Sequence, residues 1–240
     1  MILPSPRLSA TSALSALNSF VSPMISRLLF VFFASLGLCV GASVLYENDF
    51  EKADPGKLPE DLSVLDGNFT VKADPTNKFL ELPGAPLDIF SLQFGPAETS
   101  DLSVSALSVS AIIRSTAKGR RFPSFGIGLY GVAGFKLQVS PGKKFLELYK
   151  DQSLLASVPF DWKSGDWTNL RLQARQTTND IWKAEGKAWP QGAPEPSTWM
   201  ISAEHKPDSP LSGRASLFGS PFSGTPIQFD NLTVQTAKEP

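Results

Sequence analysis

The feature that most constrains this chain is a succession of short segments in which apolar and polar residues alternate. In the segment 135–139, Phe135, Leu137 and Val139 share one parity, while Lys136 and Gln138 share the other. Alternation of this kind places the apolar side chains on one face of a β-strand. Gly, Pro, Asn and Asp separate the segments, and 20 prolines in 240 residues oppose long helices. We therefore expect a fold built from strands.

Many short strands with frequent turns indicate two stacked antiparallel sheets. The sequence thus predicts an all-β fold, a two-sheet antiparallel jelly-roll sandwich, because a jelly roll leaves few exposed sheet edges. A propeller would need a repeat period, which we do not find. The expected strands are 44–51, 68–72, 78–82, 87–94, 105–113, 124–130, 135–139, 144–149, 153–159, 170–175, 180–189, 199–202, 213–219 and 226–235.

The first 42 residues differ in composition from the rest, since they contain no Asp or Glu. A short basic start at Arg27 is followed by the apolar run 28–40 and by the small residues Gly41 and Ala42. This order is typical of a secretory signal. We expect residues 1–42 to be an N-terminal extension and signal peptide, with Met24 as the true start, and residues 43–240 to form one jelly-roll domain.

A signal of this kind predicts a secreted, periplasmic or cell-envelope protein. Cys39 is the only cysteine, and a lipid anchor on it is disfavoured because the preceding Leu38 is bulkier than the Gly or Ala of lipoprotein signals. The absence of any disulfide favours a bacterial cell exterior.

The charge balance argues against nucleic acid as a partner. Lys and Arg number 22 against 23 Asp and Glu, for a formal net charge of −1. A nucleic-acid-binding domain usually carries a basic excess. A single histidine, His205, excludes a zinc site built from several His and Cys residues.

Three stretches carry a family resemblance. They are the segments 165–172 (GDWTNLRL), 181–199 (IWKAEGKAWPQGAPEPSTW) and 225–234 (TPIQFDNLTV), the last preceded by 213–219 (GRASLFG). They resemble the later strands of bacterial laminin-G-like jelly rolls, which belong to the concanavalin A-like lectin and glucanase superfamily. The resemblance spans roughly residues 45–235 and implies a concanavalin A-like sandwich that binds carbohydrate or a surface protein.

The expected ligand surface is the polar face of two adjacent strands. Long polar side chains on a sheet face can hydrogen-bond sugar hydroxyls, although they are equally normal toward solvent. Trp189 and Trp199 flank a proline-rich connection and either pin it to the sandwich or offer a ring to a sugar. The candidate ligand-binding residues are Arg171, Gln173, Arg175, Lys183, Glu185, Lys187, Trp189 and Trp199.

The stretch Glu47-Asn48-Asp49-Phe50-Glu51 repeats a spacing found on the catalytic strand of β-glucan-cleaving enzymes. On a continuous strand Glu47, Asp49 and Glu51 would share a face, and a retaining glycosidase needs two carboxylates about 5–5.5 Å apart. Glu47 and Glu51 are therefore the catalytic candidates. In the glucanases, however, the motif lies mid-chain on an inner strand, whereas here we expect segment 44–51 to pair with 226–235.

The same end of the chain offers oxygen ligands for a structural calcium ion. Calcium prefers carboxylates and carbonyl oxygens. Pairing of the first and last strands would bring Glu47, Asp49, Asp230 and Asn231 together, and these are the candidate metal ligands. The alternative is a polar sheet edge without a metal.

The sequence thus favours a secreted, non-catalytic module that binds a glycan or a cell-surface or matrix partner. One alternative is a glycoside hydrolase related to concanavalin-like keto-disaccharide hydrolase or glucanase domains. Those hydrolases often open with a strand of the type L-F-N-G-K-D-L-x-G-W, from which 45–51 departs. Another alternative is a purely structural envelope protein.

Overall fold

The computed structural model describes residues 42–85, 88–96, 106–178 and 180–237. The described residues contain strands and no helix. The strands are β1 (Val44–Asn48), β2 (Ser63–Asp66), β3 (Thr70–Ala73), β4 (Lys78–Leu82), β5 (Phe90–Phe94), β6 (Ala106–Ser115), β7 (Ser124–Leu129), β8 (Phe135–Ser140), β9 (Phe145–Lys150), β10 (Ser153–Pro159), β11 (Thr168–Thr178), β12 (Ile181–Pro190), β13 (Ile201–His205), β14 (Ala215–Ser220) and β15 (Ile227–Thr236).

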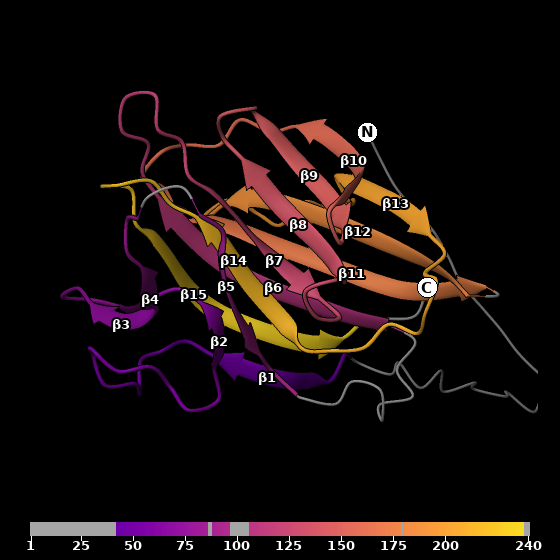
Figure 1. Ribbon diagram of the computed structural model, residues 1–240, viewed down its shortest axis with the longest axis horizontal. Coiled ribbons are helices and arrows are strands. Elements are labelled where there is room, and N and C mark those ends of the chain that lie inside the picture. The colour runs from indigo at the N-terminus through magenta and orange to yellow at the C-terminus, as the bar shows by residue number, and fades with distance from the viewer. Residues whose placement is uncertain (1–41, 86–87, 97–105, 179, 238–240) are drawn as a thin grey trace, which may run out of the picture. The chain divides into compact units, whose positions relative to one another are not determined.

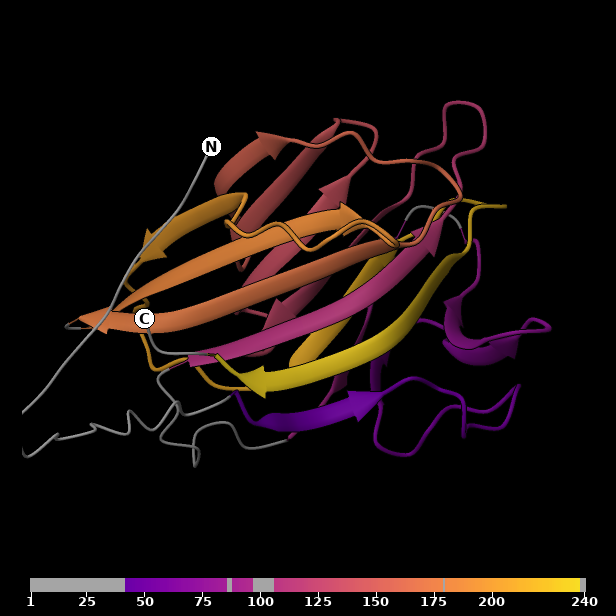
Figure 2. The same ribbon diagram turned by 180° about the vertical axis from the view of Figure 1, so that it is seen from behind.

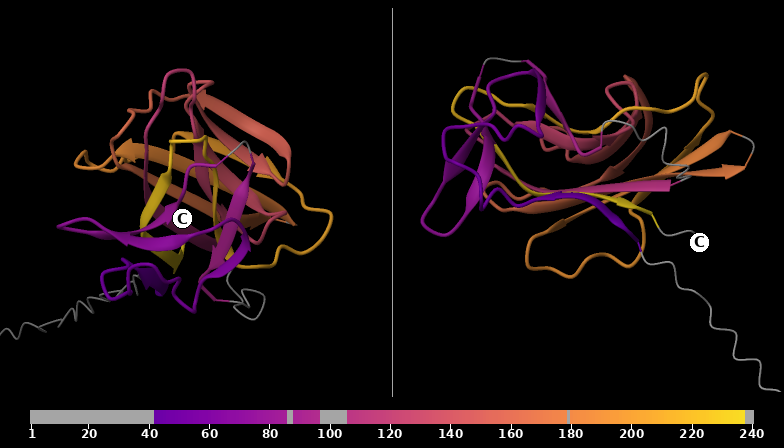
Figure 3. Two further views of the ribbon diagram at one scale, coloured as in Figure 1. Left: turned by 60° about the vertical axis from the view of Figure 1, so that its left-hand side comes forward. Right: turned by 90° about the horizontal axis from the view of Figure 1, so that it is seen from below.

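The strands form two antiparallel sheets that pack face to face. The eight-stranded sheet has the order β13-β12-β11-β6-β15-β4-β3, and β1 pairs with β15 beside this path. The seven-stranded sheet has the order β10-β9-β8-β7-β14-β5-β2. Figure 1 is viewed from the side of the seven-stranded sheet, and the right-hand view of Figure 3 shows the two layers nearly edge-on. The prediction of an all-β, two-sheet jelly-roll sandwich is confirmed.

The core lies between the sheets and is built by the alternation seen in the sequence. On β8, Phe135, Leu137 and Val139 are fully buried, whereas Lys136 and Gln138 on the opposite face are half-buried. β11 repeats this arrangement with Leu170, Leu172 and Ala174. Burying such side chains contributes about 1.5–3 kcal/mol each for the larger ones, so strand parity decides which face each sheet turns inward.

β15 changes its partner halfway along its length. Its first part pairs with β4 through Ile227–Phe229, and its last part pairs with β1, where Glu47 lies opposite Thr233. A bulge between Asp230 and Thr233 separates the two parts on the β6 side of the strand. Figure 2 shows β1, in indigo, beside the yellow β15. The expected pairing of segment 44–51 with 226–235 is confirmed, although β1 ends at Asn48.

The N-terminal predictions lie outside this description. The start at Met24, the apolar run and Cys39 all belong to residues 1–41, which are outside the described residues. Within the described ranges, no helix has the length and apolar character needed to cross a membrane.

Candidate functional site

The residues expected to bind a ligand do share one face. Arg171 lies opposite Lys187 across the β11–β12 pair, Gln173 lies opposite Glu185, and Arg175 lies opposite Lys183. The side chains of the other parity on these strands, among them Leu172 and Ala184, are buried in the core. The predicted surface is therefore the outer face of the eight-stranded sheet.

On that face the charged groups are engaged with one another. Glu185 bridges Lys183 at 2.8 Å and Arg175 at 3.4 Å. Glu195, in the connection after β12, bridges Arg171 at 2.8 Å and Lys187 at 2.7 Å. Like charges directly opposite on neighbouring strands repel, and the two carboxylates relieve that repulsion. These charged side chains are therefore held in place by ion pairs with one another.

The proline-rich connection lies against the same face. Lys187 donates to the carbonyl oxygen of Pro196 at 2.8 Å, and its amine lies 4.6 Å from the centre of the Trp199 ring. The Trp199 ring thus contacts a lysine that is only 7% exposed, and Trp189 lies half-buried at the start of the connection, opposite Asn169. These contacts hold the connection against the sheet. Pinning the connection is one of the two roles expected for the tryptophans.

The Glu-x-Asp-x-Glu stretch does not form one continuous strand. The Asn48 side chain accepts the N–H of Phe50 at 2.9 Å, and the Asp49 side chain accepts the N–H of Glu51 at 3.2 Å. Two successive turns of this kind end the strand, and Phe50 takes a φ of 59° and is buried. The expectation that Glu47 and Glu51 share a strand face is therefore wrong. The Glu51 carboxylate instead accepts the N–H of Lys78 at 2.9 Å.

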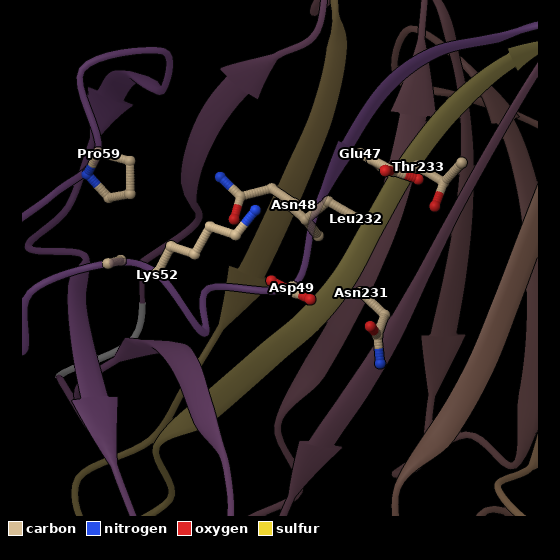
Figure 4. Close-up of a pocket in the computed structure, with 9 residues that line it drawn as sticks. Glu47, Asn48, Asp49, Lys52, Pro59, Asn231, Leu232 and Thr233 are labelled. Atoms are coloured by element: carbon tan, nitrogen blue, oxygen red, sulfur yellow. The ribbon is translucent and has the colours of Figure 1, made fainter.

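The predicted calcium ligands are only partly gathered. Glu47, Asp49 and Asn231 line a hollow of about 520 Å³ beside the paired strands β1 and β15, and Lys52 from the loop after β1 lines it too (Figure 4). Asp230 is 5% exposed and accepts hydrogen bonds from the Asn77 side chain at 2.9 Å and from the backbone N–H of Asn231 at 2.7 Å.

Within the described residues, no three His, Cys, Asp or Glu side chains form a group that could hold a metal ion. The hollow beside β1 and β15 also carries a lysine amine in addition to its carboxylates. In the part of the chain that the structure describes, the four predicted calcium ligands therefore do not come together as one site.

A second hollow, of about 560 Å³, crosses the outer face of the seven-stranded sheet. Two rows of paired residues run across this face. One row is Ser216, Gly128, Lys136 and Tyr149, and the other is Ser91, Phe218, Gly126, Gln138 and Glu147. The hollow is lined by Ile89, Ser91, Val132, Lys136, Gln138, Tyr149, Asp151, Gln152, Ser216 and Phe218.

Two glycines of β7 leave space at the base of this hollow for side chains of β14. A Cβ on Gly126 would lie 2.4 Å from the Phe218 ring, and a Cβ on Gly128 would lie 2.5 Å from the Ser216 hydroxyl. Side chains from β14 therefore occupy space that any other residue on β7 would fill. Because of the glycines, Phe218 lies over β7 and is only 8% exposed.

The hollow combines apolar and polar chemistry. Ile89 and Val132 are 68% and 53% exposed, and with Phe218 and Tyr149 they give the hollow apolar surface. Amide and hydroxyl groups come from the glutamines and serines, with one cation at Lys136 and one anion at Asp151. A concave apolar surface with a few converging polar groups is the common form of a small-ligand site.

A buried carboxylate lies beside the hollow. Glu147 is 3% exposed and accepts hydrogen bonds from the Lys143 amine at 2.9 Å and from the Ser140 hydroxyl. Burial acts to raise the pKa of Glu147, but the hydrogen bonds from Ser140 and Lys143 outweigh it and hold that pKa below its ordinary value. Glu147 therefore stays ionised at neutral pH.

The sequence reasoning did not identify this hollow. Its residues come from β5, β14, β7, β8, β9 and the neighbouring loops, so no single stretch contains it. One signal was present: on the segment 124–130, glycines hold the outward parity while Phe125, Ile127 and Leu129 hold the inward one. Outward glycines in an otherwise regular strand often mark a close approach of another group.

The chain resembles several solved domains in fold. No protein-family model matches the sequence, and the search of curated proteins gives no match. The carbohydrate recognition domain of Emp46p in its potassium-bound form has 14% identity and a TM-score of 0.52, with 80% of this chain and 95% of that chain covered. The PL-14 alginate lyase from Aplysia kurodai has 11% identity and a TM-score of 0.50, with 82% of this chain and 100% of that chain covered.

At these identities the likeness establishes the fold. The chain is a two-sheet jelly-roll sandwich, the fold that the resemblance implied. Both an Emp46p recognition domain with bound potassium and a metal-free form match with similar TM-scores, 0.52 and 0.51, so the fold likeness is the same with and without the ion.

Proposed function

We propose that the chain is a secreted, non-catalytic module of the laminin-G-like kind, and that it binds carbohydrate outside a bacterial cell. The observation that carries this proposal is the hollow on the outer face of the seven-stranded sheet. The secretory signal expected in residues 1–42 and the carbohydrate-binding proteins among the fold neighbours support it.

The hollow suits a sugar because a sugar ring has an apolar C–H face and a rim of hydroxyls. The Phe218 and Tyr149 rings and the exposed Ile89 and Val132 offer surface to the C–H face. The amide of Gln138 and the amine of Lys136 offer hydrogen bonds to the hydroxyls. The volume of about 560 Å³ lies within the usual range of about 300–1,000 Å³ for small-ligand sites.

The opposite face is less suited to binding a free ligand. There Arg171, Arg175, Lys183 and Lys187 already share the carboxylates of Glu185 and Glu195, so a ligand would have to compete with an existing pairing. The Lys136 amine has no carboxylate partner among the ion pairs of the described residues.

A pair of lysine variants tests this assignment. Lys136 and Lys183 both project from the outer face of a sheet, one on each layer, and both are half-buried. We expect Lys136→Ala to weaken binding to whichever glycan the wild-type chain captures on a glycan array, and Lys183→Ala to leave it unchanged. Titration calorimetry with that glycan measures both.

The opposite pattern would place the site on the eight-stranded sheet and overturn the assignment to the hollow. No binding to any glycan on the array would reject the carbohydrate function itself. Turnover of a glycoside by the wild-type chain would reject the non-catalytic part of the proposal.

A further inference from the structure

We propose that Glu147 fixes the direction of the hydrogen bonds in the hollow, so that the hollow selects ligands by the hydroxyl hydrogens they donate. The ligand class is then a neutral, hydroxyl-rich sugar, and a uronate or sulfated sugar is disfavoured. This inference rests on the proposed function and adds the class of ligand. Glu147 acts here as a positioning residue, through Gln138.

The first step is that Glu147 can only accept hydrogen bonds. Its carboxylate receives hydrogen bonds from Ser140, Lys143 and the Gln138 amide. An ionised carboxylate has acceptors and no donor. Every group that touches it must therefore turn a hydrogen toward it, and Ser140 does so with its only hydroxyl hydrogen.

The second step is the orientation of the Gln138 amide. Its Nε2 donates to the Ser140 oxygen at 2.7 Å and to Glu147 Oε2 at 3.3 Å. A flipped amide would set Oε1 against the carboxylate and against the lone pairs of Ser140, because the Ser140 hydrogen is already used. Two repulsions therefore oppose the flip, and the amide oxygen Oε1, an acceptor, is held on the side away from Ser140 and Glu147, where a ligand can donate to it.

Tyr149 lies beside the same carboxylate. Burial raises the pKa of its phenol first, and the Glu147 carboxylate raises it further, so the phenol stays protonated at neutral pH. The acceptor that Glu147 fixes in the hollow is therefore that of Gln138 on β8.

The third step is the chemistry of a matching ligand. It must donate to Gln138 Oε1 and accept from the Lys136 amine on the adjacent row. A sugar hydroxyl can do both. A carboxylate or sulfate group at this position only accepts, so it would leave Gln138 unmatched and would face the negative charge of Asp151. A site built to accept from a hydroxyl discriminates strongly against analogues that lack the hydrogen.

The variant Glu147→Gln tests the inference and has a matched control in the chain. Gln at 147 has nearly the same shape but can donate, so it removes the constraint on Gln138. The control is Glu81→Gln on the opposite sheet, where Gln228 Nε2 donates to Glu81 Oε2 at 3.0 Å in a similar pair. Both variants lose one carboxylate that accepts from a glutamine, and only one of them is beside the hollow.

The ligand probes are cellohexaose, laminarihexaose, mannohexaose and xylohexaose, with polyguluronate as the acidic comparison. For the neutral probe that binds, monodeoxyfluoro analogues replace one hydroxyl at a time with a group that cannot donate. We expect at least one analogue to lose about tenfold in affinity, equivalent to about 1.4 kcal/mol. Glu147→Gln should narrow that loss to less than threefold, and Glu81→Gln should keep it. An unchanged loss in Glu147→Gln, or tighter binding of polyguluronate than of every neutral probe, would overturn the inference.

A ligand-free measurement separates this inference from the proposed function. In the wild-type chain the Gln138 amide nitrogen donates to Ser140 and to Glu147, so at least one of its side-chain N–H signals should exchange slowly with water. That signal should exchange faster in Glu147→Gln and at the wild-type rate in Glu81→Gln. If no probe binds, the carbohydrate proposal fails, and the exchange of the Gln138 amide alone decides the hydrogen-bond direction. Rapid exchange in the wild-type chain would overturn it.

Discussion

Removal of the second part of β15 should unfold the whole sandwich. A chain that ends at Gln228 loses Phe229, Leu232 and Val234, which are 0%, 0% and 1% exposed. It also loses the residues that pair with β1 and much of the partner of β6. Because β15 lies inside the eight-stranded sheet, the cut leaves unpaired backbone on both sides.

The magnitude follows from the burial of these three side chains. Deleting a large buried apolar side chain costs about 2–5 kcal/mol, so three of them cost at least about 6 kcal/mol. The total stability of a domain is about 5–15 kcal/mol. The lost backbone pairing with β1 and β6 adds to the cost, and we therefore expect no folded state at 25 °C.

Thermal melting followed by circular dichroism measures this, with a chain that ends at Ala237 as the control because it keeps all of β15. The control should melt like the full chain. A cooperative transition of the shorter chain within a few degrees of the control would refute the view that β15 joins the two ends of the sheet.

Three further outcomes follow from individual residues. Gly126→Ala would set a Cβ 2.1 Å from the Leu137 carbonyl oxygen and 2.4 Å from Phe218, so it should lower the melting temperature, whereas Gly142→Ala, with its nearest contact at 3.5 Å, should not. Burial raises the pKa of Asp230 in the folded state, so a proton on this carboxyl group stabilises the fold. That stabilisation is full below the unfolded-state pKa of about 3.9 and is lost as the pH rises through the folded-state pKa. The melting temperature of the wild-type chain should therefore fall relative to Asp230→Asn as the pH rises above about 3.9, and a constant difference would contradict this. Calcium should leave the melting temperature unchanged relative to EDTA, because the carboxylates of the described residues form no group of three that could hold a metal ion. A calcium-dependent rise that Asp49→Asn removes would restore the sequence-based prediction.

Strand parity made most of the fold readable in the sequence. Segments such as Phe135–Ser140 alternate cleanly because one face is fully buried and the other is not. β2 was missed because it lies at a sheet edge, where Leu65 is 49% exposed and only Val64 is partly covered by the core. An edge strand of this kind carries no strong alternation, since neither face is deeply buried.

The candidate sites were less readable, for a different reason. Parity correctly placed Arg171 and Lys187 on a shared face, but it says nothing of a third group, such as Glu195, that comes from a loop and pairs with both. Strand propensity likewise extended the first strand to Glu51, although the side chains of Asn48 and Asp49 capture backbone N–H groups and end it. Local hydrogen bonds and cross-strand neighbours decided these points.

The pairing of β1 with β15 has a consequence for the connectivity of the fold. At the open end of the pair, the N–H of Thr236 donates to the carbonyl of Ser43 at 2.9 Å, and the N–H of Ser43 donates to the Thr236 hydroxyl at 2.8 Å. These two residues stand where a hairpin turn would begin and end. An Asn-Gly turn inserted between them would suit such a pair, and new ends could open at Gly165, where a Cβ would meet nothing within 4 Å. With the two ends joined, the connectivity of the strands becomes a closed ring, and a circularly permuted chain should retain every strand pair.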